Sequence, residues 1–168
     1  MFIAQGALSR AARVQLLVLD LDGTLTSGET WFRHGNEQLK AFHEHDRVGL
    51  QRVHDAGLHT ALITTGELPA ERKIAEELRI RFSYEDTKDK RRAFLSLLRQ
   101  AKLNAERTAY MGDDTVDLAV LRRCGLACAP ADAHEDVRRM AHFVTSARAG
   151  YGAVRQVCDF ILHARLRG

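Results

Sequence analysis

The sequence predicts an α/β protein built on a doubly wound parallel sheet. A nearly continuous apolar run from Val14 to Leu19 ends in a carboxylate, which is typical of a strand buried on both faces. Later short apolar stretches of the same kind alternate with segments whose apolar residues have helical spacing. This alternation favours a Rossmann-like sheet with right-handed crossover connections.

The expected elements follow one another along the chain in this alternating order. The predicted strands are residues 14–19, 58–64, 108–111 and 126–129. The predicted helices are residues 46–56, 69–79, 87–102, 114–124, 133–141 and 152–166. No internal repeat, low-complexity tract or linker interrupts them, so we expect residues 1–168 to form one domain.

One segment, at about 28–43, breaks the alternation. Residues 29–33 and 38–42 read as two strands around a Gly35-Asn36 turn, which predicts a β-hairpin inserted after the first strand. Its apolar residues are expected to form one face, which a two-stranded hairpin cannot keep stable alone in water; they are Trp31, Phe32, Leu39 and Phe42. We therefore expect a partner subunit to cover the hairpin.

Composition excludes several classes of protein. The 25 Lys+Arg and 22 Asp+Glu residues give a formal net charge of +3, unlike the strongly basic footprint of a nucleic-acid binder. Residues 1–10 are too short and interrupted for a membrane span and lack the pattern of a secretion signal. The three cysteines, Cys124, Cys128 and Cys158, suit reduced core thiols. These features predict a cytoplasmic protein with a small anionic ligand.

Two carboxylates, Asp20 and Asp22, stand where the first predicted strand ends, before Gly23 and Thr24. Ligands of open α/β sheets bind outside the carboxyl ends of strands, and Gly23 permits a sharp turn that brings both carboxylates to one ligand. An Asp-Gly turn with an aspartate capping a helix is the alternative explanation. The rest of the sequence favours a functional site.

A second acidic group follows the predicted strand 108–111 and opens a helix: Asp113, Asp114 and Asp117. Helix capping accounts for one or two of these aspartates. Packing Asp20, Asp22 and Asp113 together would cost several kcal/mol unless a cation neutralised them. A hard divalent ion resolves this repulsion, and few carboxylates combined with a phosphate ligand favour Mg²⁺.

Candidate phosphate ligands lie between these two groups. Thr64, Thr65 and Gly66 end the second strand with hydroxyls and with backbone N–H groups, and Lys90 begins a helix. Taken singly, each is an ordinary surface feature. Their order along the chain, between the two aspartate groups, carries the argument.

That order resembles the haloacid dehalogenase superfamily of phosphotransferases, whose motifs are all present in this sequence. The resemblance implies that Asp20 attacks phosphorus and that Asp22 protonates the leaving oxygen and then activates water. It further implies phosphoryl binding by Thr64 and Lys90, and Mg²⁺ binding by Asp20, Asp113 and the Asp22 backbone carbonyl. Asp114 and Asp117 would orient Lys90 and the metal's water ligands.

The short insert implies a capless member, resembling the branch of 3-deoxy-D-manno-octulosonate 8-phosphate and acylneuraminate 9-phosphate phosphatases. That branch assembles as a tetramer through its hairpin. Asp46 is retained, but Glu67 and Tyr151 stand near positions where the branch usually has arginine. Asp46, Glu67 and Tyr151 are our candidates for the substrate pocket, and the altered positions leave the leaving group open.

The leading hypothesis is therefore a magnesium-dependent phosphatase that hydrolyses a small sugar or sugar-acid phosphate through an aspartyl-phosphate on Asp20. We expect it to form a homotetramer through the hairpin and to bind neither nucleic acid nor membrane. A binding or regulatory subunit with the same fold, a phosphatase for a different phosphate, and phosphotransfer to an acceptor other than water are the alternatives. The paired Asp20 and Asp22 favour catalysis, because a binding module has no need of a proton-shuttling carboxylate.

Overall fold

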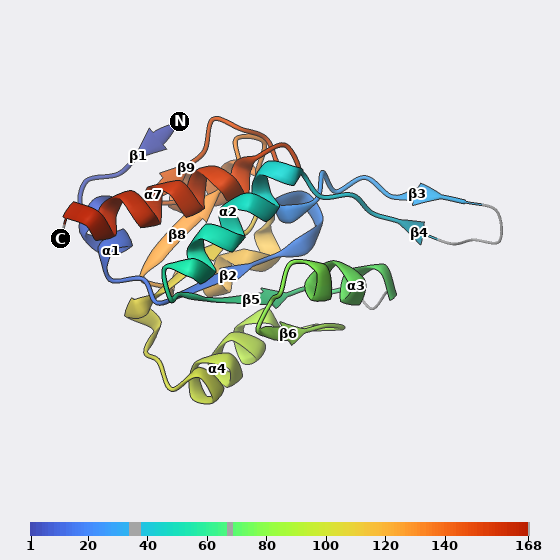
Figure 1. The fold of residues 1–168 in the computed structure, drawn as a ribbon, viewed down its shortest axis with the longest axis horizontal. Helices are drawn as coiled ribbons and strands as arrows, with labels where there is room; N and C mark the ends of the chain where they lie inside the picture. Colours follow the sequence, from blue (N-terminus) through green and yellow to red (C-terminus); the bar gives the residue numbers. More distant parts are fainter. Residues whose placement is uncertain (34–37, 67–68, 168) are drawn as a thin grey trace.

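The computed structural model describes residues 1–33, 38–66 and 69–167, whose main feature is a seven-stranded sheet (Figure 1). Its strands lie in the order β1 (Phe2–Ile3), β9 (Phe143–Val144), β8 (Leu126–Ala129), β7 (Thr108–Met111), β2 (Leu16–Leu19), β5 (His59–Ile63) and β6 (Phe82–Tyr84). Neighbouring strands are parallel except for the edge pair β1 and β9. The predicted doubly wound parallel sheet is confirmed.

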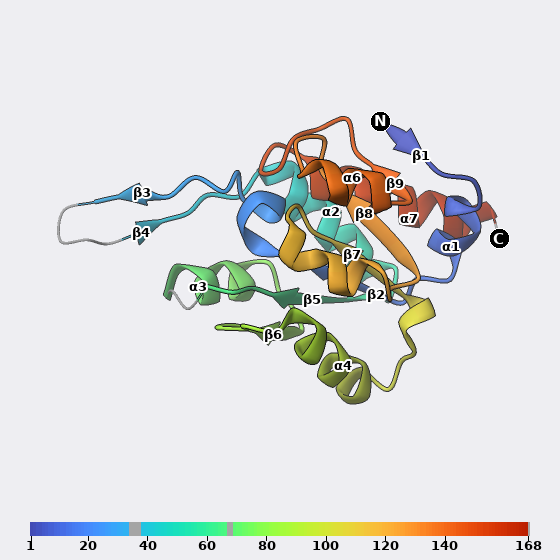
Figure 2. The same cartoon turned by 180° about the vertical axis from the view of Figure 1, so that it is seen from behind.

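Helices cover both faces of the sheet (Figures 1 and 2). One layer consists of α1 (Ala7–Ala12), α2 (Glu44–Asp55), α3 (Pro69–Glu77) and α7 (Ala153–Arg167). The opposite layer consists of α4 (Lys90–Ala101), α5 (Leu118–Leu121) and α6 (Glu135–Met140). The sheet has a hydrophobic core on each face, because successive side chains of β2 point to opposite faces. Leu17 and Leu19 pack under the first helix layer, while Leu16 and Val18 pack under the second.

The predicted element boundaries need several corrections. The helix expected at 87–102 begins at Lys90, because the Asp89 side chain caps it by accepting the N–H of Arg92. The helix expected at 114–124 is a 3₁₀ turn (Thr115–Asp117) followed by the short α5. A further 3₁₀ turn (Ala105–Arg107) precedes β7. Helix α1 and the strands β1, β6 and β9 were not predicted from the sequence.

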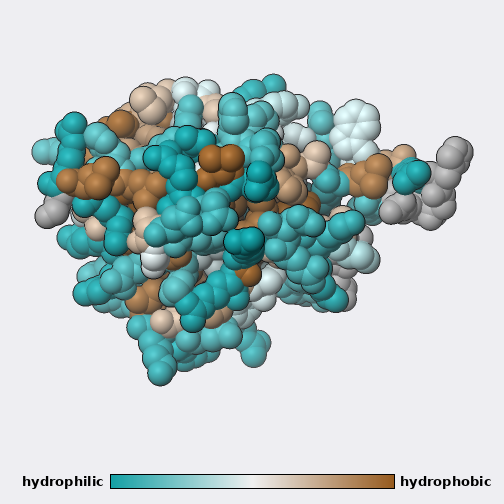
Figure 3. All heavy atoms as spheres, in the orientation of Figure 1, coloured by the Kyte–Doolittle hydropathy of each residue, from teal (hydrophilic) through white to brown (hydrophobic). Residues whose placement is uncertain are grey.

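The inserted ribbon projects from one end of the sheet (Figure 1). β3 (Trp31–Phe32) and β4 (Gln38–Leu39) pair antiparallel, with Trp31 opposite Leu39. The predicted Gly35-Asn36 turn lies outside the described residues. Trp31, Phe32 and Leu39 are 63%, 69% and 44% exposed, and Figure 3 shows hydrophobic atoms on this ribbon.

Phe42 corrects the predicted apolar face of the hairpin. It pairs with Thr26 in an isolated antiparallel bridge at the base of the ribbon and packs partly buried against the core. The exposed apolar group therefore consists of Trp31, Phe32 and Leu39. Within the described residues, no helix has the length and apolar character needed to cross a membrane.

Candidate active site

The site lies at the carboxyl ends of three adjacent strands. β2 lies between β5 and β7. The chain runs outward from β2 through β5 to β6, then returns to β7 on the other side of β2 and runs outward to β8 and β9, which makes the carboxyl end of β2 a topological switch point. Asp20 directly follows β2, Thr64 follows β5, and Asp113 stands two residues beyond β7. The Asp20 N–H donates to the Met111 carbonyl at 2.9 Å, which ties two of these strand ends together. Parallel pairing thus brings distant sequence motifs to one place.

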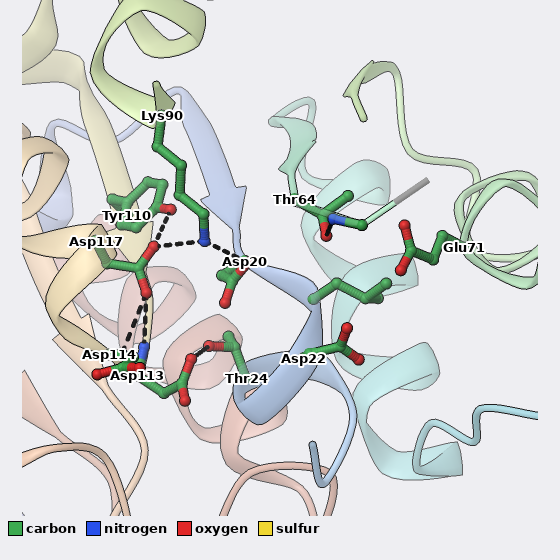
Figure 4. Close-up of polar contacts among 12 residues, drawn as sticks. Asp20, Asp22, Thr24, Thr64, Glu71, Lys90, Tyr110, Asp113, Asp114 and Asp117 are labelled. Carbon is green, nitrogen blue, oxygen red and sulfur yellow. Dashed lines mark hydrogen bonds and ion pairs between the residues drawn. The ribbon is translucent and has the colours of Figure 1, made fainter. Parts of the chain in front are cut away.

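Lys90 links the nucleophile candidate to a second aspartate (Figure 4). Its Nζ lies 2.6 Å from Asp20 Oδ1 and 2.8 Å from Asp117 Oδ1, and all three side chains are buried. Burial alone would lower the pKa of Lys90, but the charges of Asp20 and Asp117 outweigh it and raise that pKa. Lys90 is therefore held as an ammonium group beside Asp20.

Asp117 is the centre of a buried hydrogen-bond network. Its Oδ1 accepts the Tyr110 hydroxyl at 2.6 Å in addition to Lys90, and its Oδ2 accepts the backbone N–H groups of Asp113 at 3.1 Å and Asp114 at 3.3 Å. Burial raises the pKa of Tyr110 well above its usual value, so the hydroxyl donates as a neutral phenol. Because both carboxylate oxygens are engaged, Asp117 positions its neighbours.

Asp20, Asp113 and Asp117 form a possible metal-binding group among the described residues, with one oxygen of each within 4.8 Å of the others. The engaged oxygens of Asp117 leave Asp20 and Asp113 as the available side-chain ligands. Thr24 Oγ1 donates to Asp113 Oδ1 at 3.4 Å. Gly23 has a φ of 78°, and a Cβ there would lie 2.1 Å from Asp113 Oδ2, so a side chain at residue 23 would displace this carboxylate.

The electrostatics of these acids fit a bound cation. Burial, reinforced by repulsion from Asp117, raises the pKa of Asp113 to about 6. Burial first, and then the charge of Asp117, raises the pKa of Asp20 well above its usual value despite Lys90. Each shift records an unfavourable carboxylate charge, which an oxygen-liganded divalent ion would compensate.

Asp22 lies on the opposite side of the Asp20 loop, toward Glu71 (Figure 4). Its side chain is 42% exposed and forms a salt bridge with Lys40, which also lies 2.6 Å from Glu71 Oε1. Thr26 Oγ1 donates to the other oxygen, Asp22 Oδ1, at 3.1 Å. Asp22 is thus the more solvent-accessible of the two predicted catalytic carboxylates.

The predicted phosphate ligands differ in their placement. Thr64 is buried, and its Oγ1 accepts the Gly66 N–H at 3.1 Å, which leaves its hydroxyl proton available to a ligand. Thr65 is exposed, so the structure does not bring it into the buried group with Asp20 and Lys90.

The remaining predicted residues differ in burial, and one of them lies outside the described residues. Asp46 is fully buried and accepts the N–H groups of Gly152 at 3.2 Å and Arg155 at 2.7 Å, so its carboxylate holds the start of α7. Tyr151 is exposed, and Glu67 lies outside the described residues. Asp114 is exposed and caps the turn that follows it.

A cavity of about 390 Å³ opens beside Asp22 and Asp113. Its lining also includes the acidic residues Glu29 and Asp132. Asp132 accepts a hydrogen bond from Arg148 Nε at 3.0 Å. The cavity therefore offers space for a ligand beside both Asp22 and Asp113.

The sequence analysis missed Lys40, Glu71 and Tyr110. Glu71 had a signal, because residues 71, 74, 75 and 78 share the spacing of one helix face and the other three are apolar. A charged residue on such a face predicts a buried partner. No sequence pattern indicated a role for Lys40, because its contacts depend on the direction in which the hairpin leaves the sheet.

Comparison with known proteins agrees with this geometry. A family model of haloacid dehalogenase-like hydrolases matches residues 84–157. The 3-deoxy-D-manno-octulosonate 8-phosphate phosphatase of Yersinia pestis is 36% identical over 163 residues, covering 97% of this chain and 87% of that protein. The chain belongs to the haloacid dehalogenase-like hydrolases. The phosphatase of the same name from Haemophilus influenzae is 34% identical over 152 residues, covering 90% of this chain and 84% of that protein.

Solved structures of the same family superpose closely on this chain. The Yersinia pestis enzyme gives a TM-score of 0.94 over 98% of this chain and 89% of that one, at 36% identity. The Moraxella catarrhalis 3-deoxy-D-manno-octulosonate 8-phosphate phosphatase, solved with magnesium, phosphate and KDO, gives 0.92 over 96% and 92%, at 30% identity. These matches confirm the predicted family, phosphatase class and magnesium cofactor.

Proposed function

We propose that this phosphatase hydrolyses a sugar-acid phosphate monoester through an aspartyl-phosphate on Asp20. The observation that carries the proposal is the buried Asp20 carboxylate, which is held 2.6 Å from Lys90 beside Asp113 and has Asp22 two residues further along the chain. The group combines a nucleophile, a phosphoryl-binding cation, a metal-binding carboxylate and a proton donor. A binding module would need no such combination.

In the first step, an Asp20 oxygen attacks phosphorus and the bond to the leaving oxygen breaks. Lys90 and the Thr64 hydroxyl bind the phosphoryl oxygens, and Asp22 gives its proton to the leaving oxygen. Asp20 and Asp113, with the Asp22 backbone carbonyl, would hold Mg²⁺, which neutralises negative charge on the phosphoryl group.

In the second step, water attacks the phosphorus of the aspartyl-phosphate. Asp22, now a carboxylate, takes a proton from that water, and Asp20 leaves as a carboxylate while inorganic phosphate is released. Each turnover thus returns Asp22 to its protonated form. Asp117 and Tyr110 keep Lys90 in place throughout.

The relatives named for 3-deoxy-D-manno-octulosonate 8-phosphate support a sugar-acid phosphate as substrate. A neutral sugar phosphate is the second candidate, because Glu67 and Tyr151 stand near the positions expected to carry arginine. Glu29 and Asp132 add acidic groups to the cavity wall, although Arg148 offsets the charge of Asp132.

Phosphate release from a panel of monoesters separates these candidates. The panel contains 3-deoxy-D-manno-octulosonate 8-phosphate, 6-phosphogluconate, glucose 6-phosphate and p-nitrophenyl phosphate, each assayed with Mg²⁺ and with excess EDTA. The proposal expects the highest kcat/KM for 3-deoxy-D-manno-octulosonate 8-phosphate and loss of turnover in EDTA. Preference for glucose 6-phosphate over 6-phosphogluconate would select the neutral substrate, and full activity in EDTA would refute the proposed chemistry.

We also propose a homotetramer assembled through the hairpin. Exposed Trp31, Phe32 and Leu39 support it, because a projecting two-stranded ribbon cannot bury them itself. Light scattering at micromolar concentration is expected to give a tetramer for the wild type and smaller species for Phe32→Glu. A monomeric wild type would contradict this assembly.

Two further proposals concern the whole chain. Residues 1–168 are proposed to form one phosphatase domain, supported by the single sheet that joins all described strands except β3 and β4. A cytoplasmic location is proposed because Cys124, Cys128 and Cys158 are buried free thiols, which suits a reducing compartment.

A further inference from the structure

We propose that Lys40 is a positioning residue for catalysis: anchored by Glu71, it holds the Asp22 carboxyl group in the orientation needed to protonate a poor leaving group. This inference rests on the proposed function of Asp22 and adds two residues to it. Lys40 belongs to the inserted hairpin and Glu71 to α3, so neither is part of the strand-end motifs that hold Asp20 and Asp113.

Two of these three side chains, those of Lys40 and Glu71, are sheltered from water, whereas that of Asp22 is half-exposed. Lys40 Nζ forms salt bridges with Asp22 Oδ2 and with Glu71 Oε1, the latter at 2.6 Å. The Lys40 side chain is 3% exposed and that of Glu71 is 0% exposed. Exposed ion pairs are mobile, but burial fixes Lys40 between the loop that carries Asp22 and helix α3.

Glu71 can reach Lys40 because the neighbouring loop has no side chain at Gly66. A Cβ at Gly66 would lie 2.0 Å from Glu71 Oε1, so any larger residue there would push the Glu71 carboxylate away. Lys40 Nζ thus donates to Asp22 Oδ2 and to Glu71 Oε1 at the same time.

Asp22 is held at both oxygens. In the ionised form, Thr26 donates to Oδ1 at 3.1 Å while Lys40 donates to Oδ2. In the proton-donating form Oδ1 carries the proton, Lys40 still holds Oδ2, and the Thr26 hydroxyl can donate to the Leu21 carbonyl instead. Since the side chain is 42% exposed, little packing would otherwise restrict its rotation. Loss of Lys40 would free the carboxyl group to turn away from the cavity, and misplacing a proton donor by about 1 Å can cost roughly a hundredfold in rate.

This role makes a prediction about leaving groups. A sugar alkoxide leaves only if it receives a proton, whereas p-nitrophenolate is a stable anion and needs little assistance. Because kcat/KM covers the steps up to release of the first product, it reports on Asp22 as a proton donor. A contact that served only to stabilise the hairpin would change both esters alike.

The test compares Lys40→Met, Glu71→Gln and Lys40→Arg with the wild type. Each is assayed with Mg²⁺ on p-nitrophenyl phosphate and on the sugar phosphate of the panel above that the wild type hydrolyses fastest. We expect Lys40→Met to lose about 30-fold to 100-fold in kcat/KM on the sugar phosphate and less than about threefold on p-nitrophenyl phosphate. Glu71→Gln should show a smaller loss of the same selectivity. Lys40→Arg should retain part of the activity on the sugar phosphate that Lys40→Met loses.

Lys102→Met is the matched control, because Lys102 is exposed at the far end of α4 from Lys90. It should leave both rates unchanged. Equal losses on the two esters, or no loss in a folded Lys40→Met, would overturn the inference. If Lys40→Met does not fold by circular dichroism, the same selectivity measured in Glu71→Gln decides the question. A wild type inactive on every ester would instead refute the proposed function.

Discussion

The two proposed catalytic carboxylates, Asp20 and Asp22, have very different surroundings. Asp20 is buried at the end of a central strand and bonded to Lys90, which is fixed in turn by Asp117. Asp22 is half-exposed and forms a salt bridge with Lys40, a residue of the hairpin. In the proposed mechanism, the sheet therefore builds the phosphoryl-binding half of the site, while the hairpin completes the leaving-group half. This division would let the leaving group diverge among relatives without disturbing phosphoryl transfer.

The largest effect is expected on the Asp20 side. Asp20→Asn removes the nucleophile and should reduce kcat by at least about a thousandfold on every ester, including p-nitrophenyl phosphate. Asp55→Asn is the control, since Asp55 is exposed at the end of α2. Steady-state kinetics and circular dichroism would check the result. Retained turnover in pure Asp20→Asn would remove the distinction between the two carboxylates.

The next largest difference between the Asp20 side and the Asp22 side is expected in the free energy of unfolding. Asp117→Asn removes the buried charge that Lys90 and Tyr110 share and leaves Lys90 with Asp20 as its charged partner, so we expect a loss of about 3 kcal/mol in the free energy of unfolding. Asp22→Asn alters a half-exposed ion pair and should cost less than about 1 kcal/mol. Urea titration of both variants without Mg²⁺ measures this. Equal losses in the free energy of unfolding for the two variants would contradict the proposed difference between the Asp20 side and the Asp22 side.

The sequence predicted the Asp20 side far better than the Asp22 side. Asp20, Thr64 and Asp113 each stand at or just beyond the end of an apolar run, and parallel pairing brings such ends together whatever the detailed packing. Lys40 and Glu71 meet only because the hairpin leaves the sheet toward α3, and no local pattern encodes that direction. The role of Tyr110 was not predicted because it lies in a buried strand, where an aromatic residue usually serves core packing.

The same limit applies to the predicted substrate pocket. Asp46 was chosen because the resembling branch retains it, but its buried carboxylate binds N–H groups at the start of α7. The burial of Asp46 depends on how α2 packs on α7, and this packing cannot be predicted from the residue type at position 46. The hairpin was predictable from its alternating strands, yet the burial of Phe42 at its base was not.

Metal dependence should vary with pH through Asp113. Its pKa is raised from 3.8 to about 6 in the metal-free fold, so the folded state binds this proton more tightly than the unfolded chain. Without metal, the contribution of Asp113 to stability falls as the pH rises across that range. Mg²⁺ needs the ionised carboxylate, so its stabilising effect should grow over the same interval.

Thermal unfolding with and without Mg²⁺ at about pH 5 and about pH 7 tests this dependence. The shift in Tm caused by Mg²⁺ should be several degrees at the higher pH and smaller at the lower one. Asp113→Asn should abolish the shift at both values, whereas Asp55→Asn should keep it. A Mg²⁺ effect independent of pH would argue against Asp113 as a ligand.

Loss of the Tyr110 hydroxyl should cost less than loss of the Asp117 charge that it contacts. Tyr110→Phe keeps the ring packed against Phe94 but removes the donor to Asp117, so stability should fall by about 1.5 kcal/mol and kcat by less than about tenfold. Tyr84→Phe is the control, because the Tyr84 hydroxyl donates to Gln100 at the surface. Its cost should be below about 0.5 kcal/mol. Similar costs for the two variants would show that Asp117 does not depend on this donor.

Chemical trapping of the intermediate tests the central role of Asp20 most directly. Asp22→Asn should still transfer the phosphoryl group from p-nitrophenyl phosphate but hydrolyse the intermediate slowly, so phosphoryl-enzyme should accumulate. Acid quenching, borohydride reduction and peptide mass spectrometry should then find residue 20 converted to homoserine, with no conversion when Asp20→Asn is added. A burst of p-nitrophenol from Asp22→Asn with residue 20 unmodified would contradict the account.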